Sequence, residues 1–140
     1  MTPKEFPKVF ATGWALPKPD GFLEFFIPMI ASDAVFVQPS FGEARGPVQV
    51  AHMFRQLFTL FPDLATTPRH SAVSGDIVFI ESICTATVGS QPIQFSVCDR
   101  FVIRDGQIHE RMSHSDAVPT ALAIARSPRA WPRAIRSKRM

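Results

Sequence analysis

One aspartate stands out in the stretch FSVCDRFVIRDGQIHERMSHSD, residues 95–116. In an extended strand the side chains alternate between two faces, so Asp99 would share its face with four apolar residues, Phe95, Val97, Phe101 and Ile103. A carboxyl group desolvated there would keep its proton and donate a hydrogen bond to a bound carbonyl or enolate oxygen. The alternative is a structural ion pair with a basic side chain. Asp99 is therefore the first candidate for chemistry.

The sequence RDG, residues 104–106, decides which side chains of the following strand face Asp99, and it permits two turns. A two-residue turn would direct one set inward: Ile108, Glu110, Met112, His114 and Asp116. A three-residue loop with a glycine bulge would direct the other set inward: His109, Arg111, Ser113 and Ser115. In the first arrangement His114 could act as a general base near neutral pH, whereas in the second Arg111 lies across from Asp99. The residues alone leave both open.

Other residues with reactive side chains give weaker signals. His109 and His114 are five positions apart and fall on opposite faces of a regular strand, while the other two histidines lie elsewhere, so we expect no metal site. Alternation places Cys84 and Cys98 on opposite sheet faces, which predicts two free thiols without a catalytic role.

The elements that must position Asp99 begin with helices. Residues 6–15 suit a short helix that ends at Pro17-Lys18-Pro19, and Asp20 can cap a second helix that Pro28 kinks or shortens. Residues 33–39 read as a brief strand, followed by a loop with two glycines. Pro47 suits a first helical turn, and an apolar stripe then follows at helical spacing: Val50, Phe54, Leu57 and Phe61.

The rest of the chain alternates as strands over residues 64–73, 76–88, 93–104 and 107–116. A hairpin through Ser90 would pair Val88 with Ile93 and place Ser82 opposite Asp99. The order of these elements, with helices first and an antiparallel meander afterwards, predicts an α+β domain whose helices cover one sheet face. Asp99 would then point into the core or into a cavity within it.

Length and composition fit one domain of 140 residues, with 13 Phe and no Tyr. We expect a cytoplasmic protein, because the start lacks a secretory signal and no stretch approaches a membrane span of about 18 apolar residues. The last fifteen residues carry six of the fifteen basic residues and no acid. Because prolines interrupt this tail and it has one aromatic residue, we expect it to be solvated or docked on the domain, without nucleic acid or membrane as partner.

Three segments together resemble a known family: ASDAVFVQP, GPVQVAHMFRQLFTLFPDL and CDRFVIRDGQIHERMSHSD. In order and spacing they are similar to the SnoaL-like polyketide cyclase branch of the nuclear transport factor 2-like superfamily. The resemblance covers about residues 8–118 of a single domain, with 119–140 as a basic C-terminal segment. It implies a cone-shaped α+β barrel, a curved sheet wrapped around helices with an apolar pocket, a homodimer, and chemistry without metal or organic cofactor.

The resemblance carries over to individual residues only in part. The base of ketosteroid isomerase corresponds to Gln38, which cannot take a proton, and its tyrosine donor corresponds to Trp14, which keeps only an N–H donor. Its protonated aspartic acid corresponds to Asp99. Limonene epoxide hydrolase has an acid where this chain has Ser113, and the alignment favours the bulged turn. The best-known mechanisms therefore do not transfer whole.

These observations give a set of site residues and three hypotheses. We predict Asp99 and His114 as catalytic, with six ligand-binding residues: Trp14, Gln38, Phe54, Phe58, Arg111 and Ser113. The first hypothesis is a cofactor-free isomerase, cyclase or hydrolase acting on a small apolar carbonyl or epoxide compound. The second is a binding module with the same pocket but no turnover. The third is a dimeric scaffold whose pocket is filled by its own phenylalanines.

Overall fold

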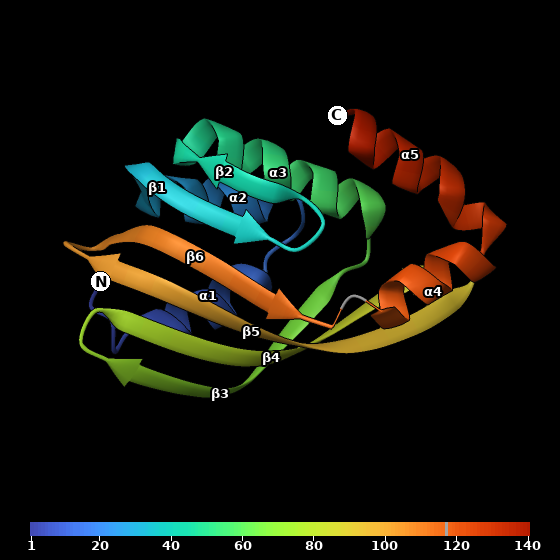
Figure 1. The fold of residues 1–140 in the computed structure, drawn as a ribbon. Coiled ribbons are helices and arrows are strands. Elements are labelled where there is room, and N and C mark those ends of the chain that lie inside the picture. Colours follow the sequence, from blue (N-terminus) through green and yellow to red (C-terminus); the bar gives the residue numbers. More distant parts are fainter. Residues whose placement is uncertain (117) are drawn as a thin grey trace.

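The computed structural model describes residues 1–116 and 118–140, and its centre is one curved six-stranded sheet (Figure 1). The strands lie in the order β2 (Gly42–Arg45), β1 (Ile30–Gln38), β6 (Gln107–Ser115), β5 (Gln91–Arg104), β4 (Ile77–Val88) and β3 (Ala65–Ser74). Strands β1 and β6 run parallel and every other neighbouring pair is antiparallel. This confirms the predicted α+β fold with a curved, mostly antiparallel sheet.

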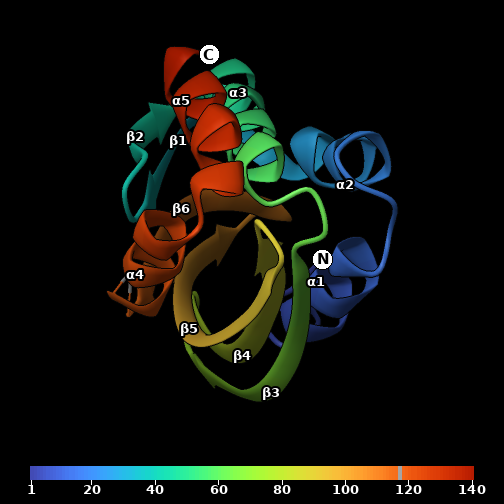
Figure 2. The ribbon, with the colours of Figure 1, turned by 90° about the vertical axis from the view of Figure 1, so that its right-hand side faces the viewer.

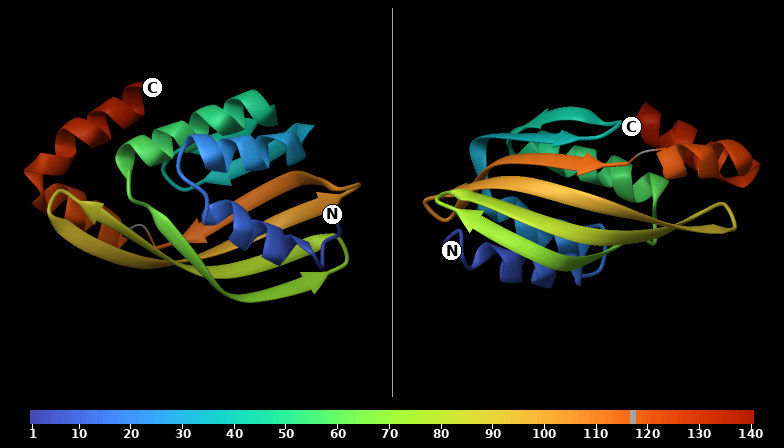
Figure 3. Two further views of the ribbon diagram at one scale, coloured as in Figure 1. Left: turned by 180° about the vertical axis from the view of Figure 1, so that it is seen from behind. Right: turned by 60° about the horizontal axis from the view of Figure 1, so that its bottom comes forward.

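Three helices fill the concave face of the sheet: α1 (Phe6–Trp14), α2 (Asp20–Phe26) and α3 (Gly46–Leu60). Figure 2 shows β3, β4 and β5 curling into a cup, and the left view of Figure 3 shows α1 lying across the long strands. The right view of Figure 3 looks onto the convex face, with the strands in front of α1. Of the helices in the described residues, none has the length and apolar character needed to cross a lipid bilayer.

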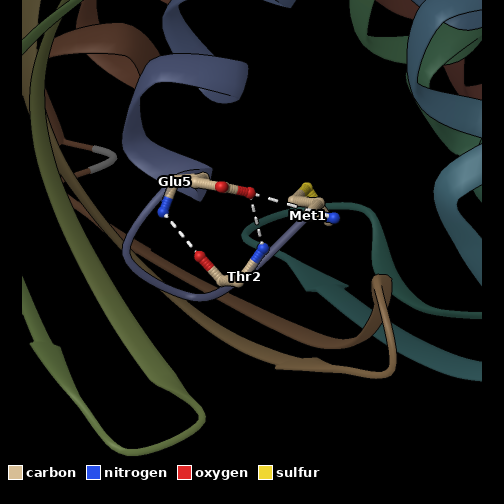
Figure 4. Close-up of polar contacts among 3 residues, drawn as sticks. All are labelled: Met1, Thr2 and Glu5. Atoms are coloured by element: carbon tan, nitrogen blue, oxygen red, sulfur yellow. Dashed lines mark hydrogen bonds and ion pairs between the residues drawn. The ribbon is translucent and has the colours of Figure 1, made fainter.

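The first helix is fixed at its start by its own residues (Figure 4). Thr2 N donates to Glu5 Oε2 over 2.9 Å, and Glu5 N donates to Thr2 Oγ1 over 3.3 Å. This reciprocal pair has the bonding pattern of a capping box, and it closes the turn just before α1, where Glu5 is the N-cap residue. Near the other end, a Cβ on Gly13 would lie 2.2 Å from the ring of Phe26. Only glycine there lets α1 and α2 approach so closely.

Helix α2 differs in one detail from expectation. Asp20 is the first helical residue rather than a cap, and its Oδ1 instead lies 3.4 Å from Nη1 of Arg55 on α3. Pro28 does shorten the helix, because it lies in a single turn of 3₁₀ helix, Ile27–Met29, that leads directly into β1. The predicted stripe of α3 is buried as expected, at Val50, Phe54 and Leu57, with Phe61 just beyond the helix.

The hairpin between β4 and β5 is tighter than predicted. Val88 pairs with Gln91 rather than Ile93, so Asp99 lies opposite Ile80 and Ser82 opposite Val97. Gly89, with φ of +65°, allows a two-residue turn where a four-residue loop was expected. The register therefore shifts by two residues. Because alternation has a period of two, every side chain keeps its predicted face.

The turn between β5 and β6 combines the two alternatives. Asp105 and Gly106, both with positive φ, close a two-residue turn that directs Ile108 inward, where it is buried. The register then shifts between Ile103↔Ile108 and Val102↔Glu110, which leaves His109 as an extra residue in β6. This bulge reverses the alternation, so Arg111 and Ser113 face inward.

The C-terminal segment forms two helices, α4 (Val118–Arg126) and α5 (Trp131–Arg139), which are separated by a 3₁₀ turn at Pro128–Ala130. They lie at the end of the sheet where β4 turns into β5 (Figure 1). Helix α5 also packs against α3. The basic segment was expected to be either solvated or docked on the domain, and it is docked. The prolines keep its helices short.

Candidate functional site

A buried polar chain crosses the concave face of the sheet. Asp99 on β5 is 2% exposed and Arg111 on β6 is 6% exposed, and Arg111 Nη2 lies 3.1 Å from Asp99 Oδ1. Arg111 Nη1 donates to Gln38 Oε1 on β1 over 2.7 Å. The guanidinium carbon also lies 5.3 Å from the centre of the Phe54 ring, a cation–π contact. Three neighbouring strands and α3 thus hold one guanidinium in place.

This geometry selects between the two interpretations of Asp99. The guanidinium stabilises the carboxylate form, whereas donation of a hydrogen bond requires the protonated form. The structure therefore favours the ion pair over the oxyanion donor. Asp99 Oδ1 has no well-directed hydrogen bond from any described residue despite its 3.1 Å approach to Arg111, so the contact is electrostatic rather than a fully formed hydrogen bond.

Two serines on the same face have buried hydroxyl groups without a partner. Ser113 pairs with Asp99 across β5 and β6, and Ser82 lies on the adjacent strand β4. Neither hydroxyl has a hydrogen-bond partner among the described residues, although Ser82 is fully buried and Ser113 is 4% exposed. An unpaired buried polar group costs about 1–3 kcal/mol. Both hydroxyls can accept or donate a hydrogen bond to a bound polar group.

Two cavities reach this group of polar residues, one at Arg111 and the other at Gln38, whereas Asp99, Ser82 and Ser113 line neither. The deep one has a volume of about 20 Å³, room for a water molecule or two, and aromatic rings and the guanidinium line it: Phe10, Trp14, Phe22, Phe54, Phe101 and Arg111. The other, which we call the mouth cavity, has a volume of about 230 Å³. Its lining includes Gln38, Phe41, Leu57, Phe61, Phe95 and Lys138. The bond from Arg111 to Gln38 therefore joins the two cavities.

The structure places the predicted catalytic histidine elsewhere. His114 is exposed and pairs with Cys98, on the convex face opposite Asp99. The bulge at His109 is the physical reason, since it exchanges the inward and outward positions of β6. His114 therefore cannot reach a ligand bound beside Asp99.

The predicted aromatic residues are buried, but they differ in position. Trp14 and Phe54 line the deep cavity. Phe58 lines neither of these two cavities, since it packs with Trp14 and Phe22, whose ring centres lie 6.0 and 5.1 Å away. The Trp14 ring itself lies 4.8 Å from that of Phe22, so these rings form a packed aromatic core.

Of the residues that line the mouth cavity, sequence reasoning assigned Gln38 to the site and missed the others, among them Phe61, Phe95 and Lys138. A signal existed for the first two, because Phe61 belongs to the apolar stripe of α3 and Phe95 shares the strand face of Asp99. No local signal could have found Lys138, because it lies about a hundred residues from the β1–β2 turn that it contacts.

The two cysteines and the metal-ligating side chains are the other candidates for chemistry. Cys84 and Cys98 are both free, as predicted, and burial raises the pKa of each thiol, most directly for the buried Cys84. Thr66 Oγ1 also lies 3.3 Å from Cys84 Sγ. In the described ranges no three His, Cys, Asp or Glu side chains come together in a way that could hold a metal ion.

The chain is similar to known proteins in sequence pattern and in fold. Residues 9–111 match the family model of the SnoaL-like domain. The fold is similar to that of a protein from Jannaschia sp. CCS1 assigned to the SnoaL-like polyketide cyclases, with a TM-score of 0.77 and 22% identity over 89% of this chain and 92% of that one. A hypothetical protein from Catenulispora acidiphila with a ketosteroid isomerase-like fold has a TM-score of 0.74 and 17% identity, over 94% and 98% of the two chains.

An epoxide hydrolase of M. tuberculosis, similar to limonene epoxide hydrolase, has a TM-score of 0.68 and 21% identity, over 94% and 96% of the chains. At these identities the structures show a shared fold. No protein among the curated sequences matches significantly. The family model, however, covers well over half of the chain, with Asp99 and Arg111 inside the matched range. The chain belongs to the SnoaL-like domain family.

Proposed function

We propose that this protein is a cofactor-free enzyme of the isomerase, cyclase or hydrolase type that acts on a small, largely apolar molecule with a carbonyl or epoxide oxygen. The observation that carries the proposal is the bond from Arg111 to Gln38, which joins two cavities with mostly apolar walls, together with the buried pairing of Arg111 with Asp99. A polar group fixed in a concave apolar site is the usual form of a small-molecule site. Fold similarity supports it only at the level of family.

The chemistry follows from the charges in this chain. Arg111 and the amide of Gln38 would hold the ligand oxygen, and the guanidinium would stabilise negative charge that develops there. The Asp99 carboxylate would accept a proton, either from the carbon beside a carbonyl or from a water that attacks an epoxide carbon. In the first case the proton returns to another carbon, and in the second it goes to the opened oxygen. No outside oxidant, reductant or cofactor is needed.

The test is a turnover screen of carbonyl and epoxide compounds, with products identified by mass spectrometry. For any substrate found, Arg111→Met and Asp99→Asn should each lower kcat at least about a hundredfold, since a positioned proton acceptor or oxyanion donor contributes about that much. The matched controls are Arg100→Met and Glu110→Gln. These two residues are adjacent in sequence to the buried pair, lie on the same two strands, and form a surface pair 3.9 Å apart. Loss of turnover in the controls as well would refute the assignment.

One observation favours a second candidate, a binding protein without turnover. The deep cavity of about 20 Å³ is too small for an organic ligand while its phenylalanine rings stay in place. In that case Asp99 and Arg111 only orient a ligand in the mouth cavity. A compound that raises the melting temperature, is released unchanged, and loses affinity in Arg111→Met would establish this candidate over the enzyme.

A further inference from the structure

The mouth cavity has an outer wall that the family match does not include. The SnoaL-like model ends at residue 111, but residues of α4 and α5 line the cavity, among them Ile124, Ala134 and Lys138. In Figure 2 these two helices lie at the near end of the curled sheet, with α5 beside α3 and α4 beside β5. The part of the chain beyond the matched domain thus closes the space into which a ligand would enter.

Specific contacts hold this wall in place. Ser137 is fully buried, and its Oγ donates to the carbonyl of Gln56 on α3 over 2.6 Å, while Gln56 Nε2 donates back to the Ser137 carbonyl over 3.2 Å. Arg133 Nη2 donates to the carbonyl of Thr87 at the end of β4 over 3.3 Å. The segment therefore docks on two separate elements of the domain. Hydrogen bonds from side chains to backbone carbonyls on both elements therefore fix the position of the wall.

Lys138 gives this wall its chemical character. Among the described residues that line the mouth cavity it is the one charged side chain. Its ammonium donates to the carbonyl of Ser40 and lies 4.6 Å from the centre of the Phe41 ring, so it is held at the cavity edge. The surrounding wall is apolar, with Leu57 and Phe61 on one side. A cation beside an apolar cavity favours a ligand with an anionic group attached to an apolar body.

We propose that α4 and α5 complete the ligand site and that Lys138 selects molecules bearing a carboxylate or similar anion at one end. The anion lies against Lys138, the apolar body lies among the rings of the mouth cavity, and the other end reaches Gln38. This inference deepens the proposed function and rests on it, because it assigns the substrate class of the same site. It adds a specificity-determining residue outside the SnoaL-like match.

Two fluorescent probes with the same aromatic skeleton test the proposal. Anilinonaphthalene sulfonate carries an anion and phenylnaphthylamine does not, so their dissociation constants isolate the contribution of charge. In Lys138→Met we expect the sulfonate to bind about fivefold more weakly, the size of a partly exposed ion pair, and the neutral probe to bind as in wild type. Lys138→Arg should keep the affinity for the sulfonate. Urea unfolding of each variant verifies that the fold is intact.

A control variant separates the cavity from the outer surface of the same helix. Arg136 lies on the exposed side of α5, in a shallow patch with Trp131 and Ile135, where a sulfonate could bind adventitiously. Arg136→Met should leave both dissociation constants unchanged. The proposal would be overturned if Arg136→Met, and not Lys138→Met, weakened sulfonate binding fivefold. It would also be overturned if Lys138→Met bound each probe with the same affinity as wild type.

Failure of this inference can be distinguished from failure of the proposed chemistry. If Lys138 controls sulfonate binding but Asp99→Asn and Arg111→Met leave turnover unchanged, anion selection stands and the proposed chemistry fails. If those variants abolish turnover while urea unfolding shows that they are still folded, and Lys138→Met has no effect on either probe, the chemistry stands and anion selection fails.

Discussion

The buried ion pair between Asp99 and Arg111 gives the sharpest prediction about this protein. Asp99→Asn removes one charge and leaves the Arg111 guanidinium, 6% exposed, without its counterion. Arg111→Met leaves the Asp99 carboxylate, 3% exposed at its side chain, in the same position. We therefore expect each single variant to be strongly destabilised, and the double variant Asp99→Leu with Arg111→Met to recover much of the loss.

The magnitude follows from the geometry of the pair. At the observed 3.1 Å and an effective dielectric constant of about 20, two unit charges attract with about 5 kcal/mol before desolvation is subtracted. Breaking a buried pair by removing one partner typically costs about 3–5 kcal/mol, because the other charge stays buried and unpaired. A domain of this kind has a total stability of about 5–15 kcal/mol, so the loss is a large fraction of it. The hydrogen bond from Arg111 to Gln38 offsets part of the loss in Asp99→Asn.

Urea unfolding measured by circular dichroism provides the assay, with all four members of the double-mutant cycle measured in one buffer. The surface pair of Arg100 and Glu110 is the control, because its nitrogen and oxygen atoms are 3.9 Å apart and its side chains are 29% and 48% exposed. Removing either of those charges should cost less than about 1 kcal/mol.

Two results would refute this reasoning. If Asp99→Asn lowers the free energy of unfolding by less than about 1 kcal/mol, water solvates Arg111 when the Asp99 carboxylate is absent. The site would then be more accessible to water than the burial of both residues implies. If the losses of the two single variants simply add in the double variant, the residues do not act as a pair. Either result would also weaken the proposed role of Arg111 as a fixed oxyanion donor.

Two further predictions concern the parts around the site. Gly89→Ala should detach α4 and α5, because a Cβ would lie 1.7 Å from Ser127 Oγ; Gly75→Ala shares the positive φ but meets nothing within 4 Å, so limited trypsin digestion should cleave the C-terminal segment faster only in Gly89→Ala. At Asp63, burial acts to raise the pKa, but hydrogen bonds from Thr87 and from the Asp63 backbone, together with the charge of Arg133, outweigh it and hold the pKa below the ordinary value of 3.8. The stabilisation is therefore full above that value and lost as the pH falls through the lower, folded-state pKa, so urea unfolding should show the advantage of wild type over Asp63→Asn disappearing in that acidic window.

Much of the architecture could be predicted because it depends on local patterns. The strands after residue 64 were placed within two residues at each end, and Asp99 was assigned to the inner face from alternation alone. That assignment survived a wrong hairpin register, since a shift of two residues preserves the face. The strand β2 was missed, because four residues in a glycine-containing loop give too short a pattern to recognise.

The candidate site could be predicted only in part. Trp14 and Arg111 line the deep cavity and Gln38 lines the mouth cavity, whereas Asp99 lines neither and contacts Arg111. His114 was assigned through a turn that the sequence left open. The decisive feature is one extra residue at His109, which changes the parity of the strand. A single bulge leaves only a weak signal in the local sequence pattern, yet it exchanges the inward and outward positions of every side chain that follows in the strand.

By itself, the sequence determined the class of fold, the face on which Asp99 lies and the presence of a basic tail, because hydrophobic periodicity and charge are properties of neighbouring residues. Only the tertiary structure decided that Arg111 is the partner of Asp99 and that Lys138 stands at the mouth cavity. Those contacts depend on a strand bulge and on the docking of a segment about a hundred residues away from the β1–β2 turn. Their energies arise from packing that exists only once the whole chain has folded.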